Sequence, residues 1–178
     1  MSGKINWFPG HMKKSLEELA RSIKLVDVVI YVLDARCPQS CMNPSFDKII
    51  GAKKVIYYYS KRDLAKNPPP NVNVLDEIKK MFPERVAGVD GVRRFVRAMV
   101  VGVPNVGKST LINKIAKRKK TKVEDRPGVT RQTQWIEVAP AIYLLDTPGI
   151  LYPNIEDPAV ARDLVAIAAI KRELKFDE

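Results

Sequence analysis

The chain has 178 residues, a formal net charge of +11 and 46% hydrophobic residues, a composition that is typical of globular proteins and excludes intrinsic disorder. No apolar run approaches the roughly 20 residues that a membrane-spanning helix needs, and the N-terminus lacks the apolar core of a signal peptide, so we expect a cytoplasmic protein with no membrane partner. The excess positive charge favours nucleic acid as a partner, although a basic surface can also serve solubility alone.

The first half of the chain alternates between helical and strand patterns. Leu16, Leu19 and Ile23 have the spacing of one helix face, and continuous β-branched runs are typical of strands that are buried on both faces. The expected elements are a helix over 13–26 or from nearer Pro9, a strand over 26–34, a short helix from Asn43-Pro44 to about residue 50, a strand over 53–60, a proline-rich connection over 67–71 and a helix over 73–82.

The second half continues the alternation. The expected elements are a short strand over 84–89, a strand over 94–103, a helix over 108–117, two strands over 134–138 and 141–146 with a turn at Ala139-Pro140, and a closing helix over 159–174. Strands that alternate with helices predict an α/β fold of three layers, in which a mostly parallel central sheet has helices on both faces.

The stretch "GVPNVGKS" at 102–109 matches the phosphate-loop pattern G-x-x-x-x-G-K-[ST], and it lies between a predicted strand and a predicted helix. Glycines allow the backbone to curl around phosphate, and the N–H groups at the start of the helix face the anion. Lys108 is expected to reach the β and γ phosphates, and the Ser109 hydroxyl to bind Mg²⁺. The nucleotide-binding candidates in this loop are Asn105, Val106, Gly107, Lys108, Ser109 and Thr110.

A second acidic motif, "LLDTPG" at 144–149, ends a predicted strand. Asp146 is placed to hold a magnesium-bound water, and the backbone N–H of Gly149 is placed to bind the γ-phosphate. Between the two motifs, Thr130 follows a Pro-Gly pair and is a candidate for a second hydroxyl ligand of Mg²⁺.

The stretch "SKRD" at 60–63 ends another predicted strand and suits recognition of a guanine base. The Asp63 carboxylate can accept from the N1 and N2 donors of guanine, and adenine lacks both donors. The aliphatic stem of Lys61 can lie along the base, and Ser60 begins the motif. In most GTP-binding domains this segment follows the phosphate loop, whereas here it precedes it.

The motifs and their order resemble those of the circularly permuted GTPases of the TRAFAC class, and most closely the YlqF/RbgA group of ribosome-assembly GTPases. The matching stretches are "NWFPGHMKK" at 6–14, "DAR" at 34–36, "NP" at 43–44, "SKRD" at 60–63, "GVPNVGKST" at 102–110, "RPGVT" at 126–130 and "DTPGILYP" at 146–153. The resemblance implies a P-loop NTPase fold whose motifs run base reader, phosphate loop, switch one and switch two.

This resemblance also implies an activity. We expect slow hydrolysis of GTP to GDP, with a cytoplasmic monomer that acts as a switch in assembly of the large ribosomal subunit and contacts ribosomal RNA. Ile150 stands where many Ras-like GTPases have a water-orienting glutamine, so another side chain must orient the water. The family pattern gives that role to His11, and it gives Asn105 a contact with a K⁺ ion. The expected catalytic residues are His11, Lys108, Thr130 and Gly149.

The sequence departs from the family in two places. Ser60 stands where the family has asparagine, so we expect guanine selectivity with a lower affinity. Residues 1–170 form the expected GTPase domain, and 171–178 only begin the helical C-terminal region of the family. The base-supporting segment near Ala87-Gly88 also matches the family poorly.

Two other readings stay open at the level of sequence. The chain could be a non-hydrolysing, weakly nucleotide-binding module that associates with RNA through its basic patches. It could also be a P-loop ATPase, although Lys61 and Asp63 argue against adenine. The charge run "KRKKTK" at 117–122 is either part of an RNA-binding surface or a solvated loop.

Overall fold

The computed structural model describes residues 5–6, 10–88, 94–116, 135–151 and 154–170. Its helices are α1 (Gly10–Ser22), α2 (Pro44–Ile50), α3 (Val74–Met81), α4 (Pro83–Ala87), α5 (Lys108–Ala116) and α6 (Pro158–Ala166), with short 3-10 helices η1 (Ile23–Leu25) and η2 (Arg62–Leu64). Its strands are β1 (Ile5–Asn6), β2 (Val28–Asp34), β3 (Lys54–Ser60), β4 (Val96–Val101), β5 (Trp135–Ala139), β6 (Ile142–Asp146) and β7 (Asn154–Ile155).

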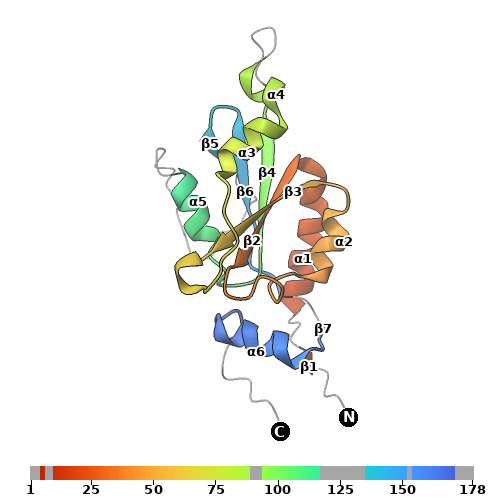
Figure 1. Ribbon diagram of the computed structural model, residues 1–178. Coiled ribbons are helices and arrows are strands. Elements are labelled where there is room, and N and C mark those ends of the chain that lie inside the picture. Colours follow the sequence, from red (N-terminus) through yellow and green to blue (C-terminus); the bar gives the residue numbers. More distant parts are fainter. Residues whose placement is uncertain (1–4, 7–9, 89–93, 117–134, 152–153, 171–178) are drawn as a thin grey trace.

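A five-stranded sheet in the order β3-β2-β4-β6-β5 forms the centre of the fold. The pairs β2–β3, β2–β4 and β4–β6 are parallel, and only β5 runs antiparallel to its neighbour β6. Figure 1 shows α1 and α2 along one side of this sheet and α5 along the other. The expected α/β fold with a mostly parallel sheet is therefore confirmed.

The central strand β2 explains why this sheet forms. All seven of its residues are buried, which is expected of a strand covered on both faces by helices. Tyr31 is the largest of them, and its ring stacks on Tyr57 of β3 and meets the edge of Phe46 of α2. Its hydroxyl accepts a hydrogen bond of 2.6 Å from the backbone N–H of Asn43, so the polar tip of this buried ring has a partner.

Most expected elements lie where the sequence predicted them. Asn43 caps α2 by accepting from the backbone N–H of Ser45, and Pro44 is the first helical residue, as the Asn-Pro pair indicates. The first helix begins at Gly10, the earlier of the two expected starts. No helix in the described ranges is long and apolar enough to cross a membrane.

Two expectations about secondary structure were wrong. The stretch 84–89 was expected to be a strand, but residues 83–87 form helix α4, because Pro83 suits a first helical position and Glu84 lies in the first turn. The closing helix was expected to continue to residue 174, but α6 ends at Ala166. Ala168 adopts a left-handed φ of 60°, and the N–H groups of Ala169 and Ile170 turn back to the Leu164 carbonyl.

A small second sheet joins the two ends of the described chain. β1 pairs antiparallel with β7, so that Ile5 lies opposite Ile155. The N-terminal stretch is thereby held beside the segment that follows Gly149. Helix α1, whose first turn contains the backbone of His11, is the next described element of the chain after β1.

Candidate functional site

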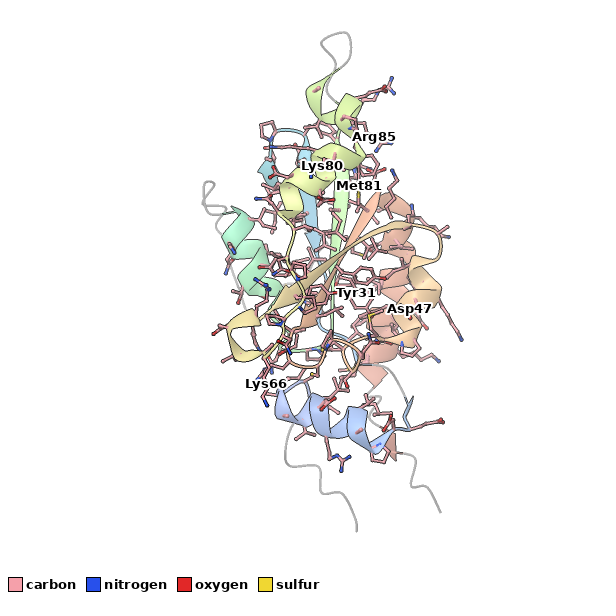
Figure 2. The ribbon with its side chains drawn as sticks, in the orientation of Figure 1. Tyr31, Asp47, Lys66, Lys80, Met81 and Arg85 are labelled. Carbon is pink, nitrogen blue, oxygen red and sulfur yellow. The ribbon has the colours of Figure 1, made fainter. Side chains whose placement is uncertain are left out.

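The sequence motifs gather at one edge of the sheet because their strands are parallel. β2 ends at Asp34, β3 at Ser60, β4 at Val101 and β6 at Asp146, and all four strands point the same way. The loops that follow these strands therefore meet at the carboxyl edge, where ligands bind in open α/β sheets. Figure 2 shows Lys66, which follows the loop after β3, at this end of the molecule and Arg85 at the opposite end.

The loop after β3 is bonded directly to the phosphate-loop stretch. The Ser60 hydroxyl donates a 2.5 Å hydrogen bond to the Val106 carbonyl, and Ser60 is buried. The Lys61 ammonium donates to the Asn105 carbonyl at 3.0 Å. These two stretches lie far apart in the sequence, yet their turns converge in space.

The Ser60 side chain is long enough to bond the phosphate-loop stretch, although it is shorter than the asparagine of the family. A β-carbon built on Gly107 would lie only 3.4 Å from the β-carbon of Ser60, so the two backbones already approach closely here. At this separation a hydroxyl reaches the opposite loop. Whether the residue lowers guanine affinity stays a prediction.

Lys108 is buried at the start of α5, with 9% of its surface exposed. Its ammonium donates to the Thr147 carbonyl at 2.6 Å and lies 3.5 Å from the Asp146 carboxylate. Burial lowers the pKa of Lys108 below its ordinary value, and Asp146 opposes this shift by favouring the charged ammonium. The lysine is thus a buried charge with few partners, at the N-terminal end of a nine-residue helix.

The loop after β6 packs against the phosphate-loop stretch at a glycine. A β-carbon on Gly149 would lie 2.6 Å from the α-carbon of Pro104, so only glycine allows this contact. The N–H of Ile150 donates to the Gly102 carbonyl at 3.2 Å, and the Ile150 side chain is buried. An apolar, buried Ile150 cannot orient a water molecule, in agreement with the inference from its residue type.

Asp34 is a site residue that the sequence analysis quoted without giving it a role. Its carboxylate is fully buried and forms an ion pair of 2.8 Å with Arg36, while the Lys61 ammonium lies 3.7 Å away. Burial alone would raise the pKa of Asp34, but hydrogen bonds from Arg36 and the positive charges outweigh it, so the pKa lies below its usual value. Asp34 therefore serves as a buried negative charge beside Arg36 and Lys61. An aspartate that ends a buried strand, with arginine two residues later, is the sequence signal that could have indicated this ion pair.

Asn71 is a second residue that the sequence analysis missed. Its side-chain amide accepts from the Tyr59 N–H at 2.8 Å and donates to the Tyr59 carbonyl at 2.7 Å. This pair of bonds replaces the missing neighbour of the edge strand β3. The end of β3 is thereby fixed just before Ser60 and Lys61.

The arrangement has the chemistry of an anion site. A buried lysine, a partly exposed carboxylate and the exposed hydroxyls of Ser109 and Thr110 lie around the start of α5. Asp63 is exposed on η2, two residues after Lys61, whose ammonium bonds the Asn105 carbonyl. A ligand with phosphates at one end and a polar ring at the other would match this separation of groups.

Comparison with known proteins agrees with this geometry. Residues 97–174 match the family model described as 50S ribosome-binding GTPase. The chain is 41% identical to ribosome biogenesis GTPase A of Bacillus cereus and 40% identical to that of Priestia megaterium, and each match includes 94% of the chain. The chain belongs to the ribosome biogenesis GTPase A family. It spans 66% and 68% of the length of these two relatives.

The fold of this family is also seen in solved structures. GDP-bound TM YlqF has a TM-score of 0.60 and 27% sequence identity, and the match covers 90% of this chain and 69% of that one. The five-stranded, mostly parallel sheet is therefore a YlqF-like fold. The resemblance that the motifs indicated is confirmed at the level of the family.

The predicted site residues differ in how far the structure describes them. Those brought together at the carboxyl edge are Ser60, Lys61, Asp63, Asn105, Val106, Gly107, Lys108, Ser109, Thr110, Asp146 and Gly149. Thr130 lies outside the described residues, as does the segment 171–178. The backbone of His11 lies in the first turn of α1, but the structure does not describe its side chain.

Asn105 has a contact that the sequence did not indicate. Its φ of 57° is left-handed, and its side-chain amide nitrogen donates to the Ala168 carbonyl at 2.8 Å. On the same side, the Ser40 hydroxyl donates to the Asp163 carboxylate of α6. Figure 1 shows α6 beyond the carboxyl edge of the sheet. The turn that follows α6 is thus bonded to the phosphate-loop stretch.

Proposed function

We propose that this chain binds GTP and hydrolyses it slowly to GDP, as a switch in assembly of the large ribosomal subunit. The observation that carries the proposal is the direct bonding of Ser60 and Lys61 to the phosphate-loop stretch, through the carbonyls of Val106 and Asn105. One nucleotide can then reach both loops. In this reading the motif order is a circular permutation, which leaves each loop on its own strand.

Guanine recognition would depend on the loop after β3. Asp63 is exposed and its carboxylate would accept from the N1 and N2 donors of guanine. Adenine would place an acceptor against this carboxylate, which leaves a polar group unpaired. Lys61 would contribute its stem, since its ammonium is held between Asp34 and the Asn105 carbonyl.

Phosphate binding would depend on the start of α5. Lys108 would exchange its contact with the Thr147 carbonyl for the β and γ phosphates, and the Gly149 N–H would bind the γ-phosphate. Charge neutralisation of these phosphates is the chemistry that a bound Mg²⁺ supplies. The exposed hydroxyl of Ser109 is a hard oxygen donor that fits Mg²⁺, Thr130 would add a second, and the Asp146 carboxylate would hold a water bound to the ion.

Water orientation would fall to a residue other than Ile150, whose side chain is buried and apolar. His11 is our candidate, because it is the only histidine in the chain and the β1–β7 pairing holds the strand that precedes its helix beside the segment that follows Gly149. A neutral imidazole can orient water near pH 7. Asn105 would assist through K⁺ if its amide oxygen binds the ion, since its amide nitrogen already has the Ala168 carbonyl as partner.

The first experiment tests the base. Titration with fluorescent GDP, and competition with GTP, ATP and XTP, should give clear preference for guanine nucleotides. Asp63→Asn should weaken the binding of GTP and strengthen the binding of XTP, because an amide can donate to the C2 carbonyl of xanthine. Lys66→Gln, an exposed change nearby, is the matched control. Equal affinities for ATP and GTP would end the guanine assignment.

The second experiment tests hydrolysis and the ribosomal role. Single-turnover phosphate release should be slow for the chain alone, faster with large ribosomal subunits, and faster in K⁺ than in Na⁺. His11→Ala should slow release by about 100-fold and spare GTP binding, which is the lower range for loss of an acid–base group. Binding without any release, with or without subunits, would favour the non-hydrolysing RNA-associated module instead.

A further inference from the structure

A basic surface hollow lies at the amino end of the sheet, opposite the nucleotide loops. It has a volume of about 450 Å³ and is lined by Leu25, Asp27, Arg85, Arg94, Phe95 and Arg97. We call this set the arginine hollow. Its residues come from η1 and the segment after it, from α4, and from β4 and the residues just before it. None of the motifs that identify the family lies in it.

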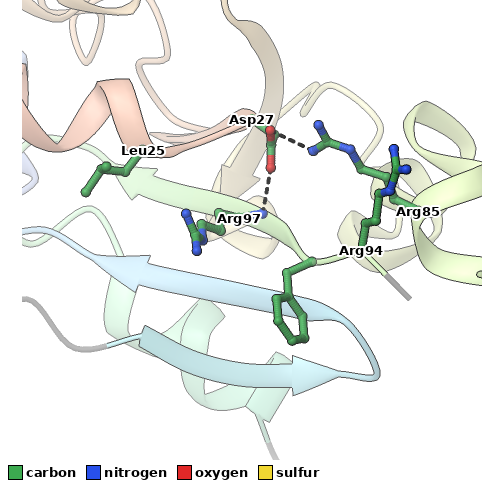
Figure 3. A pocket seen from close by; sticks show the side chains of 6 residues that line it. Leu25, Asp27, Arg85, Arg94 and Arg97 are labelled. Atoms are coloured by element: carbon green, nitrogen blue, oxygen red, sulfur yellow. Dashed lines mark hydrogen bonds and ion pairs between the residues drawn. The ribbon is translucent and has the colours of Figure 1, made fainter. Parts of the chain in front are cut away.

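The positive charge of the arginine hollow is only partly neutralised within its lining. Asp27 is the one acidic residue among the described residues that line it, and the carboxylate is already shared between the Arg85 guanidinium at 2.7 Å and the backbone N–H of Arg97 at 3.0 Å. Figure 3 shows Asp27 joined to both residues, with Arg94 beside Arg85. Three arginines and one aspartate leave an excess of two positive charges in the lining.

Aromatic side chains accompany these arginines. Phe95 is 56% exposed although it is a large apolar residue, and its ring meets Tyr143 edge-on with centroids 5.1 Å apart. The Arg97 guanidinium lies 5.8 Å from the centre of the Trp135 ring, so it is oriented by a cation–π contact. Leu25 adds a second exposed apolar side chain, at 53%.

This combination selects one kind of ligand. A peptide of acidic residues alone would use the arginines and leave Phe95 in water, and a double helix would present phosphates with its bases hidden in the stack. An unpaired strand of nucleic acid offers both phosphates and exposed base faces, which stack on aromatic rings with little dependence on sequence. Exposure of Phe95 among arginines is explained by this ligand alone of the three.

We propose that the arginine hollow binds an unpaired strand of RNA, with phosphates on Arg94 and Arg97 and a base stacked on Phe95. The proposal deepens the proposed function, in which the strand belongs to ribosomal RNA, but RNA binding at this site requires no nucleotide hydrolysis. It also separates the two ligands in space: GTP at the carboxyl edge of the sheet and RNA at its amino end.

The experiment measures fluorescence anisotropy of a fluorescein-labelled single-stranded oligouridylate on the whole chain, over a range of salt. Phe95→Ala should weaken binding by about tenfold, within the range for loss of one base stack. Arg94→Gln/Arg97→Gln should also reduce the slope of log affinity against log salt by about 1.4, as expected for two lost phosphate contacts on a single strand. Phe95→Trp should bind the oligouridylate as tightly as the unaltered chain, since indole stacks at least as well as phenyl.

The matched control is Lys48→Gln/Arg162→Gln, which removes the same charge from exposed positions on α2 and α6. It should keep affinity within about twofold, because it breaks no contact at the hollow. Equal losses in this control and in the arginine variant would overturn the proposal, as would an unchanged affinity of Phe95→Ala. Equal competition by duplex RNA, or by oligoglutamate, would assign the surface to another ligand and also overturn it.

Two further measurements distinguish a failure of this proposal from a failure of the proposed function. Each variant is checked by thermal denaturation and by binding of fluorescent GDP, both of which should match the unaltered chain. Loss of RNA binding with GDP binding intact supports the arginine hollow. Failure of GDP binding in the unaltered chain would count against the GTPase proposal and leave the RNA result standing.

Discussion

The two ends of the sheet are built in opposite ways. At the carboxyl edge the polar groups are buried and bonded across loops, with Asp34, Ser60, Lys108 and Thr147 all inside the protein. At the amino end the arginine hollow keeps its arginines and Phe95 at the surface. Buried polar groups favour one geometry, because a buried group whose hydrogen-bond partner moves away is left unsatisfied at a large cost in free energy. Exposed ones adapt to a flexible ligand at a small cost in stability.

This contrast makes Gly149→Ala the most disruptive change that we predict. The added methyl would lie 2.6 Å from the Pro104 α-carbon, which is backbone, so one of the two loops must move. We expect a loss of about 3 kcal/mol in the free energy of unfolding, the upper range for overpacking, measured by urea denaturation.

Gly51→Ala is the control for this prediction. Gly51 has a φ of +55° and a ψ of −124° but open space around it, so alanine should cost backbone strain alone, about 1–2 kcal/mol. Equal losses at Gly51 and Gly149 would show that the loops at the carboxyl edge are not tightly packed. The comparison between the two ends would then lose its basis.

Lys108→Met should separate stability from binding. Burial lowers the pKa of Lys108, so the folded state holds the charged ammonium at a cost near neutral pH. The cost diminishes as pH rises from the lowered pKa toward the ordinary one. We therefore expect the variant to be as stable as the unaltered chain, or about 1 kcal/mol more stable, at pH 7 and to lose this advantage at alkaline pH.

The same variant should bind GTP at least about 30-fold more weakly, since charge-assisted hydrogen bonds contribute about 2 kcal/mol. Lys48→Met, an exposed change on α2, should alter neither quantity. Denaturation at several pH values and nucleotide titration test both statements. A large loss of stability in Lys108→Met would mean that the lysine is structural rather than held in place for phosphate.

Sequence alone predicted the carboxyl edge much better than the amino end. The phosphate-loop stretch and "SKRD" have fixed spacings, and parallel strands must bring their following loops to one edge. The bond from Ser60 to Val106 and the one from Asn105 to Ala168 were not predictable, because they depend on how closely loops from different strands pack. No spacing rule connects residues so far apart.

The arginine hollow was not predictable either. Its residues come from three separate segments, and each alone reads as an ordinary surface charge or an isolated apolar residue. Helix α4 shows a related difficulty, because "ERVAGV" has the apolar residues of a strand while Pro83 begins a helix just before it. The apolar pattern favoured a strand and the proline favoured a helix, and the residues just before the stretch decided for the helix.

Ser60→Ala tests the bond that joins the two nucleotide loops. The Val106 carbonyl would lose its 2.5 Å partner in a buried place, so we expect a loss of about 1 kcal/mol in stability and a several-fold loss in GDP affinity. Ser22→Ala is the matched control, because the Ser22 side chain makes no cap hydrogen bond to η1. An unchanged GDP affinity in Ser60→Ala would show that the loops are held together by other contacts.

Asp27→Asn should have the smallest effect on stability and is the sharpest test of the amino end. The ion pair with Arg85 is partly exposed, so its loss should cost about 0.5 kcal/mol or less in unfolding free energy. The asparagine oxygen can still accept from the Arg97 N–H, which preserves the start of β4. Because the variant removes the one negative charge from the lining, affinity for single-stranded oligouridylate should rise by about two- to threefold. Glu156→Gln, an exposed change of equal charge near α6, should leave that affinity unaltered, and a rise of the same size in both variants would mean that RNA senses only the net charge of the protein.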